Sequence, residues 1–177
     1  MVLGIAGDAY HFTLDDRGVV GNTLGYRLHG IALMLAFFLA ILALVRLALL
    51  ADQRWGLVGK IGFVLALAGT ITTIADIWAE TIVLPGVTKT APELLELDAT
   101  GFHLAMVAST FLGLFALGWL LVAIASMRSG TGSKVAAIAM IPAAIIAGLP
   151  IGGSYILLLV ALAWLSWTAT DRATVAD

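Results

Sequence analysis

The sequence contains no cysteine and few charged residues, and these two absences narrow the classes of protein to which it can belong. Without cysteine, the chain can form no disulfide, no thiolate metal site and no iron–sulfur cluster. Charged residues make up 11% of the chain, against about 25% in a typical soluble domain. The net charge of −2 and the scattered basic residues give no indication of nucleic-acid binding.

Sequence signatures of several common enzyme classes are also missing. The chain has no Gly-x-Ser-x-Gly nucleophile elbow, no phosphate-binding Walker loop and no glycine-rich nucleotide turn after a strand. The N-terminal segment lacks the basic region and the long apolar core of a signal peptide. We therefore expect the first apolar helix of the chain to drive insertion into a membrane.

Hydrophobic residues are what the chain has in excess. They make up 62% of the sequence, and the mean hydropathy is +1.09. They fall into runs of about 17 to 25 residues, the length of helix that crosses about 30 Å of hydrocarbon. The sequence therefore predicts a single integral membrane domain over residues 1–177, with the lipid bilayer as its main partner.

Five apolar runs predict an all-α, polytopic bundle of transmembrane helices. The expected spans are residues 28–50, 58–83, 102–127, 135–149 and 155–169. The fourth run is short and rich in alanine, and it contains Pro142. Only a few residues separate it from the fifth, so the last two runs could instead form one tight hairpin. Trp164 and Trp167 are aromatic residues of the kind that anchor a helix at the membrane interface.

The basic residues predict the orientation of the bundle. Loops on one side carry Arg46, Arg54, Lys60, Arg128, Lys134 and Arg172, and those on the other carry Arg17, Arg27 and Lys89 among several acidic residues. An excess of Lys and Arg marks the cytoplasmic side of a membrane protein. We therefore expect the N-terminus outside the cell and the C-terminus in the cytoplasm.

The outer loop between the second and third runs has a helix signature of its own. Thr90 and Glu93 stand three residues apart, as in a capping box at the start of a helix. Leu94, Leu95 and Leu97 would then form an apolar face. The sequence predicts a short amphipathic helix at residues 91–98 that lies on the outer surface.

Two carboxylates in the second run give the strongest indication of function. Asp76 and Glu80 lie in a segment otherwise apolar enough to cross a bilayer, where acidic residues are costly and mark functional sites. Glu80 is expected near the outer interface and Asp76 about 6 Å deeper. Together with Thr73 they form a candidate site for a proton, a cation or a small ligand. The alternative is that Asp76 makes a structural hydrogen bond to a neighbouring helix through Ser109 or a threonine.

Helical projection divides the second run into two faces. One face carries Gly62, Gly69, Thr72, Thr73, Asp76 and Glu80, and the other carries Phe63, Leu67, Ile71, Ile74 and Trp78. Small and polar residues favour close contact between helices in a bilayer, and the third run has a similar series, Ala105, Ser109, Gly113 and Ala116. We expect these two helices to pack together and the large apolar face to meet lipid. The same small-residue faces could bind a second copy of the chain or another membrane protein.

All three histidines fall on the predicted outer side. His11 lies in the N-terminal segment, His29 near the start of the first run and His103 near the start of the third. Imidazole and carboxylate groups suit zinc or another divalent metal, and two histidines could ligate a haem. A polar role at the membrane interface is the simpler interpretation, because no His-Glu-x-x-His motif joins these residues.

Several short elements occur in order between residues 81 and 169. They are Leu84-Pro85, Ala91-Pro92-Glu93-Leu94-Leu95, Leu117-Gly118-Trp119-Leu120-Leu121, Leu149-Pro150 and Ala161-Leu162-Ala163-Trp164-Leu165-Ser166-Trp167. This order resembles that of a diffuse group of small bacterial multi-pass membrane proteins. The resemblance implies a membrane architecture and a bacterial plasma-membrane location, and it assigns no functional residues.

Three functions are consistent with these patterns. In the first, Asp76, Glu80 and Thr73 bind a proton, a cation or a small ligand from the outer side. In the second, the chain is a non-catalytic accessory or structural subunit of a membrane complex. In the third, Asp76 or Glu80 acts as a general acid or base beside His103 on a lipophilic substrate. The sequence favours a role other than catalysis.

Overall fold

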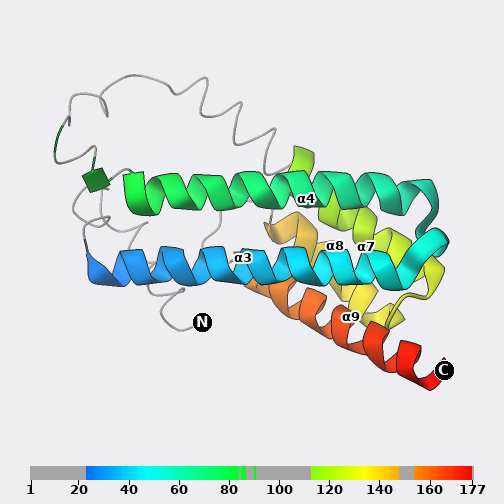
Figure 1. Cartoon of the computed structure of the whole chain (residues 1–177). Helices are drawn as coiled ribbons and strands as arrows, with labels where there is room; N and C mark the ends of the chain where they lie inside the picture. Colours follow the sequence, from blue (N-terminus) through cyan, green and yellow to red (C-terminus); the bar gives the residue numbers. More distant parts are fainter. Residues whose placement is uncertain (1–22, 84, 87–89, 91–112, 148–153, 177) are drawn as a thin grey trace.

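The computed structural model describes residues 23–83, 85–86, 90, 113–147 and 154–176, and within them the chain is all-α (Figure 1). These residues form five α-helices and no strand, which confirms the predicted fold class at this level. The α-helices are α3 (Leu24–Ala51), α4 (Gly56–Trp78), α7 (Leu117–Ser129), α8 (Lys134–Ala147) and α9 (Ser154–Ala176). A 3-10 turn, η1 (Asp52–Trp55), joins α3 to α4, and a π-helical turn, η2 (Ala79–Val83), extends α4.

The helices overlap the apolar runs of the sequence, with differences at their ends. Helix α3 starts four residues before the run expected at 28–50, and α9 continues to Ala176 instead of ending near residue 169. Helix α8 contains Pro142, whose side chain is exposed, and continues through it. The start of the third expected span and the short helix expected at 91–98 lie outside the described residues.

The five helices pack as a closed ring. Each one lies against the next along the chain, and α9 closes the ring by packing on α3 (Figure 1). Helices α4 and α7 are antiparallel, because Gly62 lies next to Leu121 and Val122 while Gly69 lies next to Phe115. The core inside the ring is apolar and includes Phe37, Leu44, Leu47, Phe115, Trp119, Met140, Leu158, Leu162 and Leu165.

Glycine allows the two chain reversals at one end of this ring. Gly56 has φ +57° where η1 meets α4, and Gly130 has φ +72° at the end of α7. Residues with a side chain rarely adopt positive φ, so these positions favour glycine. The turn after α7 is fastened to the last helix by a hydrogen bond of 2.8 Å from the Ser133 amide to Thr168 Oγ1. Helices α7, α8 and α9 are therefore held together at this end.

Small residues let α4 and α7 approach closely, as the sequence predicts. A Cβ atom added at Gly69 would lie 2.5 Å from the Phe115 backbone, and one added at Gly118 would overlap the backbone of Ala66. Trp119, fully buried, donates a hydrogen bond of 3.2 Å from Nε1 to Thr70 Oγ1 across the same contact. On α4, Gly62 and Gly69 of the predicted face make this contact. On α7 the small residue is Gly118, whereas Gly113 of the predicted series is exposed and Ala105 and Ser109 lie outside the described residues.

The predicted division of the second run into a lipid face and a packing face is partly wrong. Thr72, expected on the packing face, is exposed. Phe63, Leu67 and Ile74, expected to face lipid, are partly buried against the core. The reason is that α4 packs on α3 as well as on α7, so two sides of the helix are covered. Ile71 and Trp78 remain exposed, as expected.

Two helical segments are long and apolar enough to cross a membrane, Leu24–Ala51 and Gln53–Val83. Only 22% of the most apolar window of the first is buried inside the protein, and 33% in the second. Large apolar side chains along α3 point outward, among them Leu35, Phe38, Leu39, Leu42 and Leu49. The core helix of a soluble protein would bury such residues, so these two helices present an apolar surface instead.

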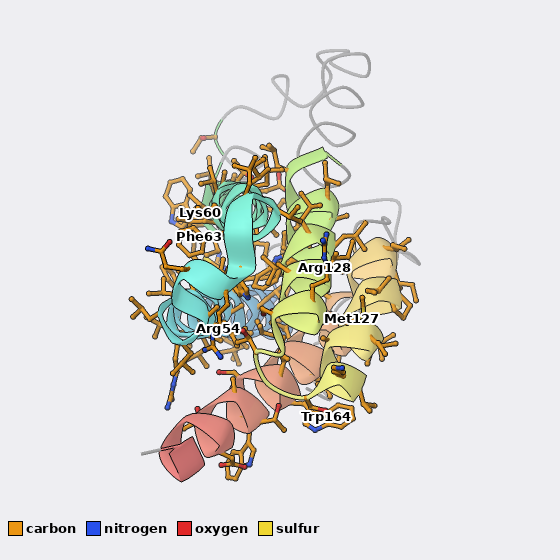
Figure 2. All side chains as sticks on the ribbon, turned by 90° about the vertical axis from the view of Figure 1, so that its right-hand side faces the viewer. Arg54, Lys60, Phe63, Met127, Arg128 and Trp164 are labelled. Carbon is orange, nitrogen blue, oxygen red and sulfur yellow. The ribbon has the colours of Figure 1, made fainter. Side chains whose placement is uncertain are left out.

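The two ends of the ring differ in charge. Figure 2 views the end of the bundle that carries the basic residues Arg54, Lys60 and Arg128. Lys134 lies at this end too, because α8 begins directly after the turn that follows Arg128. We call this end the Lys60 end. At the opposite end of α3 and α4 lie Tyr26, Asp76 and Glu80, and we call it the Glu80 end.

Candidate functional site

Asp76 and Glu80 lie at the Glu80 end, where the regular α-helix gives way to a π-helical turn. Asp76 is in the last turn of α4 and Glu80 is the second residue of η2, and both side chains are half-buried. The amide of Ala79, the first residue of η2, donates to the carbonyl oxygens of both Ala75 and Asp76. Single π-helical turns inside α-helices occur frequently at functional sites.

Glu80 has a partner on α3. The hydroxyl of Tyr26 donates a hydrogen bond of 3.5 Å to Glu80 Oε2. Tyr26 is in the first turn of α3, and its ring is half-buried. A phenol and a carboxylate from two different helices therefore meet at this end of the bundle.

The contact between α3 and η2 is close because a glycine occupies the next turn of α3. A Cβ atom at Gly30 would overlap the side chain of Thr81, which is 2% exposed. Tyr26 and Gly30 are four residues apart and so share one face of α3. The same approach that buries Thr81 against Gly30 brings Glu80 within reach of Tyr26.

The threonine hydroxyls of α4 donate to their own helix. Thr73 is 4% exposed, and its Oγ1 donates a hydrogen bond of 2.8 Å to the Gly69 carbonyl. Thr72 donates to the carbonyls of Ala68 and Gly69 in the same way. Threonine commonly makes this bond in a helix. Thr73 keeps lone pairs that can accept a hydrogen bond, and its role in ligand binding stays a prediction.

The structure describes one of the three histidines. His29 is buried, with 7% of its surface exposed, and lies one turn after Tyr26 on α3. His11 and His103 lie outside the described residues, as does Ser109, the suggested structural partner of Asp76. No three histidine or acidic side chains within the described ranges are grouped so that they could hold a metal ion. The divalent-metal and haem sites stay predictions, as does an enzymatic role for His103.

Sequence reasoning missed Tyr26. One feature of the sequence could have pointed to it. Tyr26 lies three residues before His29, next to the start of the first apolar run, and that start is expected on the outer side of the membrane. Its pairing with Glu80 depends on how α3 and η2 align, which no local pattern specifies.

Comparison with protein-family models, with curated protein sequences and with solved structures gives no match to this chain.

Proposed function

We propose that the chain is a multi-pass integral membrane protein of the bacterial plasma membrane, and that Asp76 and Glu80 bind a proton or a small cation from the outer side. The observation that carries this proposal is a half-buried acidic pair at one end of an exposed apolar helix, with Tyr26 hydrogen-bonded to Glu80. Acidic residues at membrane depth are costly and are typical of ion and proton sites.

Exposed apolar surface supports membrane insertion. Most side chains in the most apolar parts of α3 and α4 are not covered by the rest of the chain. Lys60 and Trp78, both exposed, lie 18 residues apart on α4. At 1.5 Å per residue they are about 27 Å apart, close to the thickness of the hydrocarbon core. Lysine and tryptophan are residues that typically anchor a helix at the two interfaces.

Charge supports the orientation. Arg54, Lys60 and Arg128 lie at one end of the bundle, and the acidic pair lies at the other. The side of a membrane protein that is rich in Lys and Arg faces the cytoplasm. This orientation puts Glu80 at the outer interface and Asp76 about one helical turn deeper.

The chemistry of the pair favours a positively charged ligand. Acidic residues four apart on a helix repel each other when both are ionised. A proton or a small cation between them removes this repulsion, and the lone pairs of the two carboxylates supply hard oxygen ligands. The Tyr26 hydroxyl makes a long contact of 3.5 Å with one of these carboxylates and restricts its motion, which reduces the entropy that binding must remove.

Binding measurements on charge-neutral variants test this proposal. The purified protein in lipid nanodiscs is titrated with sodium, potassium, calcium and zinc ions by calorimetry, and proton uptake is followed after a jump in pH. Asp76→Asn and Glu80→Gln should abolish the response or weaken it at least tenfold. Asp171→Asn is the matched control, because it removes one exposed carboxylate from α9. Equal responses in all three variants and the unaltered protein would refute the site.

A further inference from the structure

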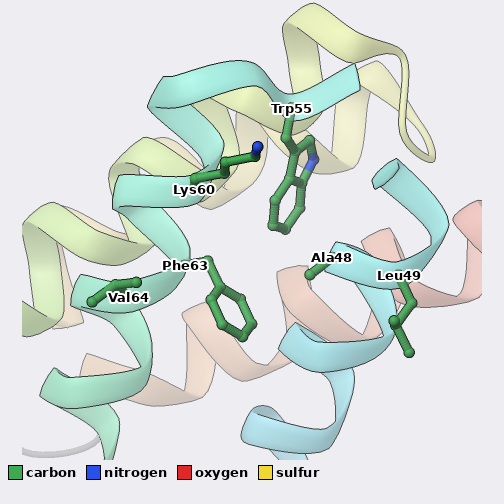
Figure 3. A pocket seen from close by; sticks show the side chains of 6 residues that line it. All are labelled: Ala48, Leu49, Trp55, Lys60, Phe63 and Val64. Atoms are coloured by element: carbon green, nitrogen blue, oxygen red, sulfur yellow. The ribbon is translucent and has the colours of Figure 1, made fainter. Parts of the chain in front are cut away.

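A second candidate site lies at the Lys60 end, where a pocket of about 330 Å³ opens between α3 and α4 (Figure 3). Its lining residues are Ala48, Leu49, Trp55, Lys60, Phe63 and Val64. Pockets that bind small molecules measure about 300 to 1,000 Å³. Its walls are mostly apolar, and two of the lining side chains can donate hydrogen bonds.

Glycine at two positions shapes this pocket. Gly56, with φ +57°, turns the chain from η1 into α4, so that Trp55 lies beside the first turn of that helix. A Cβ atom at Gly59 would overlap the Trp55 side chain. Because Gly59 has none, the indole fits against α4 and is only 6% exposed.

The buried indole carries a hydrogen-bond donor with no acceptor. Trp55 Nε1 is shielded from solvent and makes no hydrogen bond within the described part of the chain. A buried donor without an acceptor is costly, and tryptophan usually finds a partner for this group. The ring of the indole lines the pocket, and a small shift of this side chain would be needed to open Nε1 to an acceptor on a ligand there.

A lysine at the same pocket supplies positive charge. Lys60 is exposed, and Figure 3 shows its ammonium group next to the Trp55 side chain, with the indole nitrogen on the opposite edge of the ring. Arg54, the basic residue next to Trp55, donates instead to the carbonyl oxygens of Leu50 and Ala51. Lys60 makes no hydrogen bond or ion pair with the residues that the structure describes, so it can bind an anion.

We propose that this pocket binds an anionic phospholipid of the cytoplasmic leaflet. The phosphodiester accepts a hydrogen bond from the exposed Lys60 ammonium group, and a second from Trp55 Nε1 once a small shift of the indole opens that donor. An acyl chain follows the apolar walls between the two helices. Leu49 and Val64, which are 75% and 61% exposed, continue those walls onto the outer surface of the bundle. This inference rests on the proposed membrane insertion and is independent of the acidic site.

Position and wall chemistry favour a lipid over a soluble anion. Basic pockets between transmembrane helices on the cytoplasmic side bind anionic headgroups. A free phosphate ion would use the two donors and leave the apolar walls without a partner. A phospholipid contacts the donors and the walls together, because its headgroup binds at the basic side of the pocket while its acyl chain covers the apolar walls.

Native mass spectrometry of the detergent-solubilised protein with phosphatidylglycerol tests the site. Lys60→Gln should reduce the apparent affinity about fivefold, the effect of one basic residue near an anionic surface. Trp55→Phe, which keeps a ring but removes the donor, should give a similar loss. Arg128→Gln is the control, because it removes a basic residue from the same end without touching the pocket. Phosphatidylcholine should bind more weakly, and millimolar inorganic phosphate should not displace phosphatidylglycerol.

The outcomes distinguish failure of the lipid site from failure of the proposed membrane insertion. Unchanged binding in Lys60→Gln and Trp55→Phe relative to Arg128→Gln would overturn the lipid site, and so would displacement by inorganic phosphate or equal binding of phosphatidylcholine. Alkaline carbonate extraction of membranes tests insertion separately. Release of the protein by carbonate would overturn both insertion and the lipid site. Retention of the protein together with loss of binding in the two pocket variants supports both.

Discussion

The hydroxyl of Tyr26 and a carboxylate oxygen of Glu80 meet at 3.5 Å although the two residues are 54 positions apart in the chain. The bond joins the first turn of α3 to the π-helical turn that extends α4. Next to it, Thr81 packs against Gly30. The proposed acidic site is therefore held by two helices, and its geometry depends on how they align.

A double-mutant cycle measures the contact between Tyr26 and Glu80. Tyr26→Phe keeps the ring and removes the donor, and should lower the free energy of unfolding by about 0.5–1.5 kcal/mol. In a Glu80→Ala background, which removes the acceptor, the same change should cost measurably less. Tyr155→Phe, in a ring that packs on Phe37 of α3, is the control and should add independently to Glu80→Ala. Additive behaviour of Tyr26→Phe and Glu80→Ala would contradict the hydrogen bond.

Gly118→Ala tests the close approach of α7 to α4. The new methyl group would overlap the Ala66 backbone, so the two helices must separate or shift. We expect the free energy of unfolding in mild detergent to fall by about 1–3 kcal/mol. At Gly25, also in a helix, an added Cβ meets nothing within 4 Å. Gly25→Ala should therefore be neutral or stabilising by up to about 1 kcal/mol. Equal stability of the two variants would show that the helices do not pack as described.

Trp119→Phe tests the buried hydrogen bond between α7 and α4. The substitution removes part of a fully buried ring and the donor to Thr70 Oγ1. The resulting cavity and lost bond should cost about 1–3 kcal/mol in thermal or denaturant unfolding. Trp167→Phe is the matched control, because Trp167 is 72% exposed, and it should change stability by less than about 0.5 kcal/mol. A comparable effect of both variants would exclude the proposed role of Trp119.

Helix positions and one helix contact could be predicted from the sequence. Long apolar runs mark α3, α4, α8 and α9, because the few polar residues within them do not interrupt the helical pattern. Gly62 and Gly69 stand seven residues apart on one face, which favours close packing, and α7 packs there. These features depend on local composition and helical periodicity alone.

Contacts between distant segments could not be predicted. Projection at a constant angle assigned Phe63 and Ile74 to lipid because it allowed for one neighbouring helix, whereas α4 has two. Glu80 lies in the π-helical turn at Ala79–Val83, and no residue pattern marks such a turn. The sequence also could not predict that the indole nitrogen of Trp55 is buried without an acceptor. Burial of this ring depends on the space that Gly59 leaves at the start of α4.

Closure of the ring by α9 has a consequence for biosynthesis. Phe37 on α3 packs edge-on against Tyr155 at a centroid distance of 5.6 Å, so the first described helix contacts the last. Ribosomes deliver α3 well before α9, and domains acquire their contacts in the order in which segments emerge. During translation the inner face of α3 therefore lacks its contact with α9 until that helix has been made. The bundle reaches its final packing only after synthesis of the C-terminal segment.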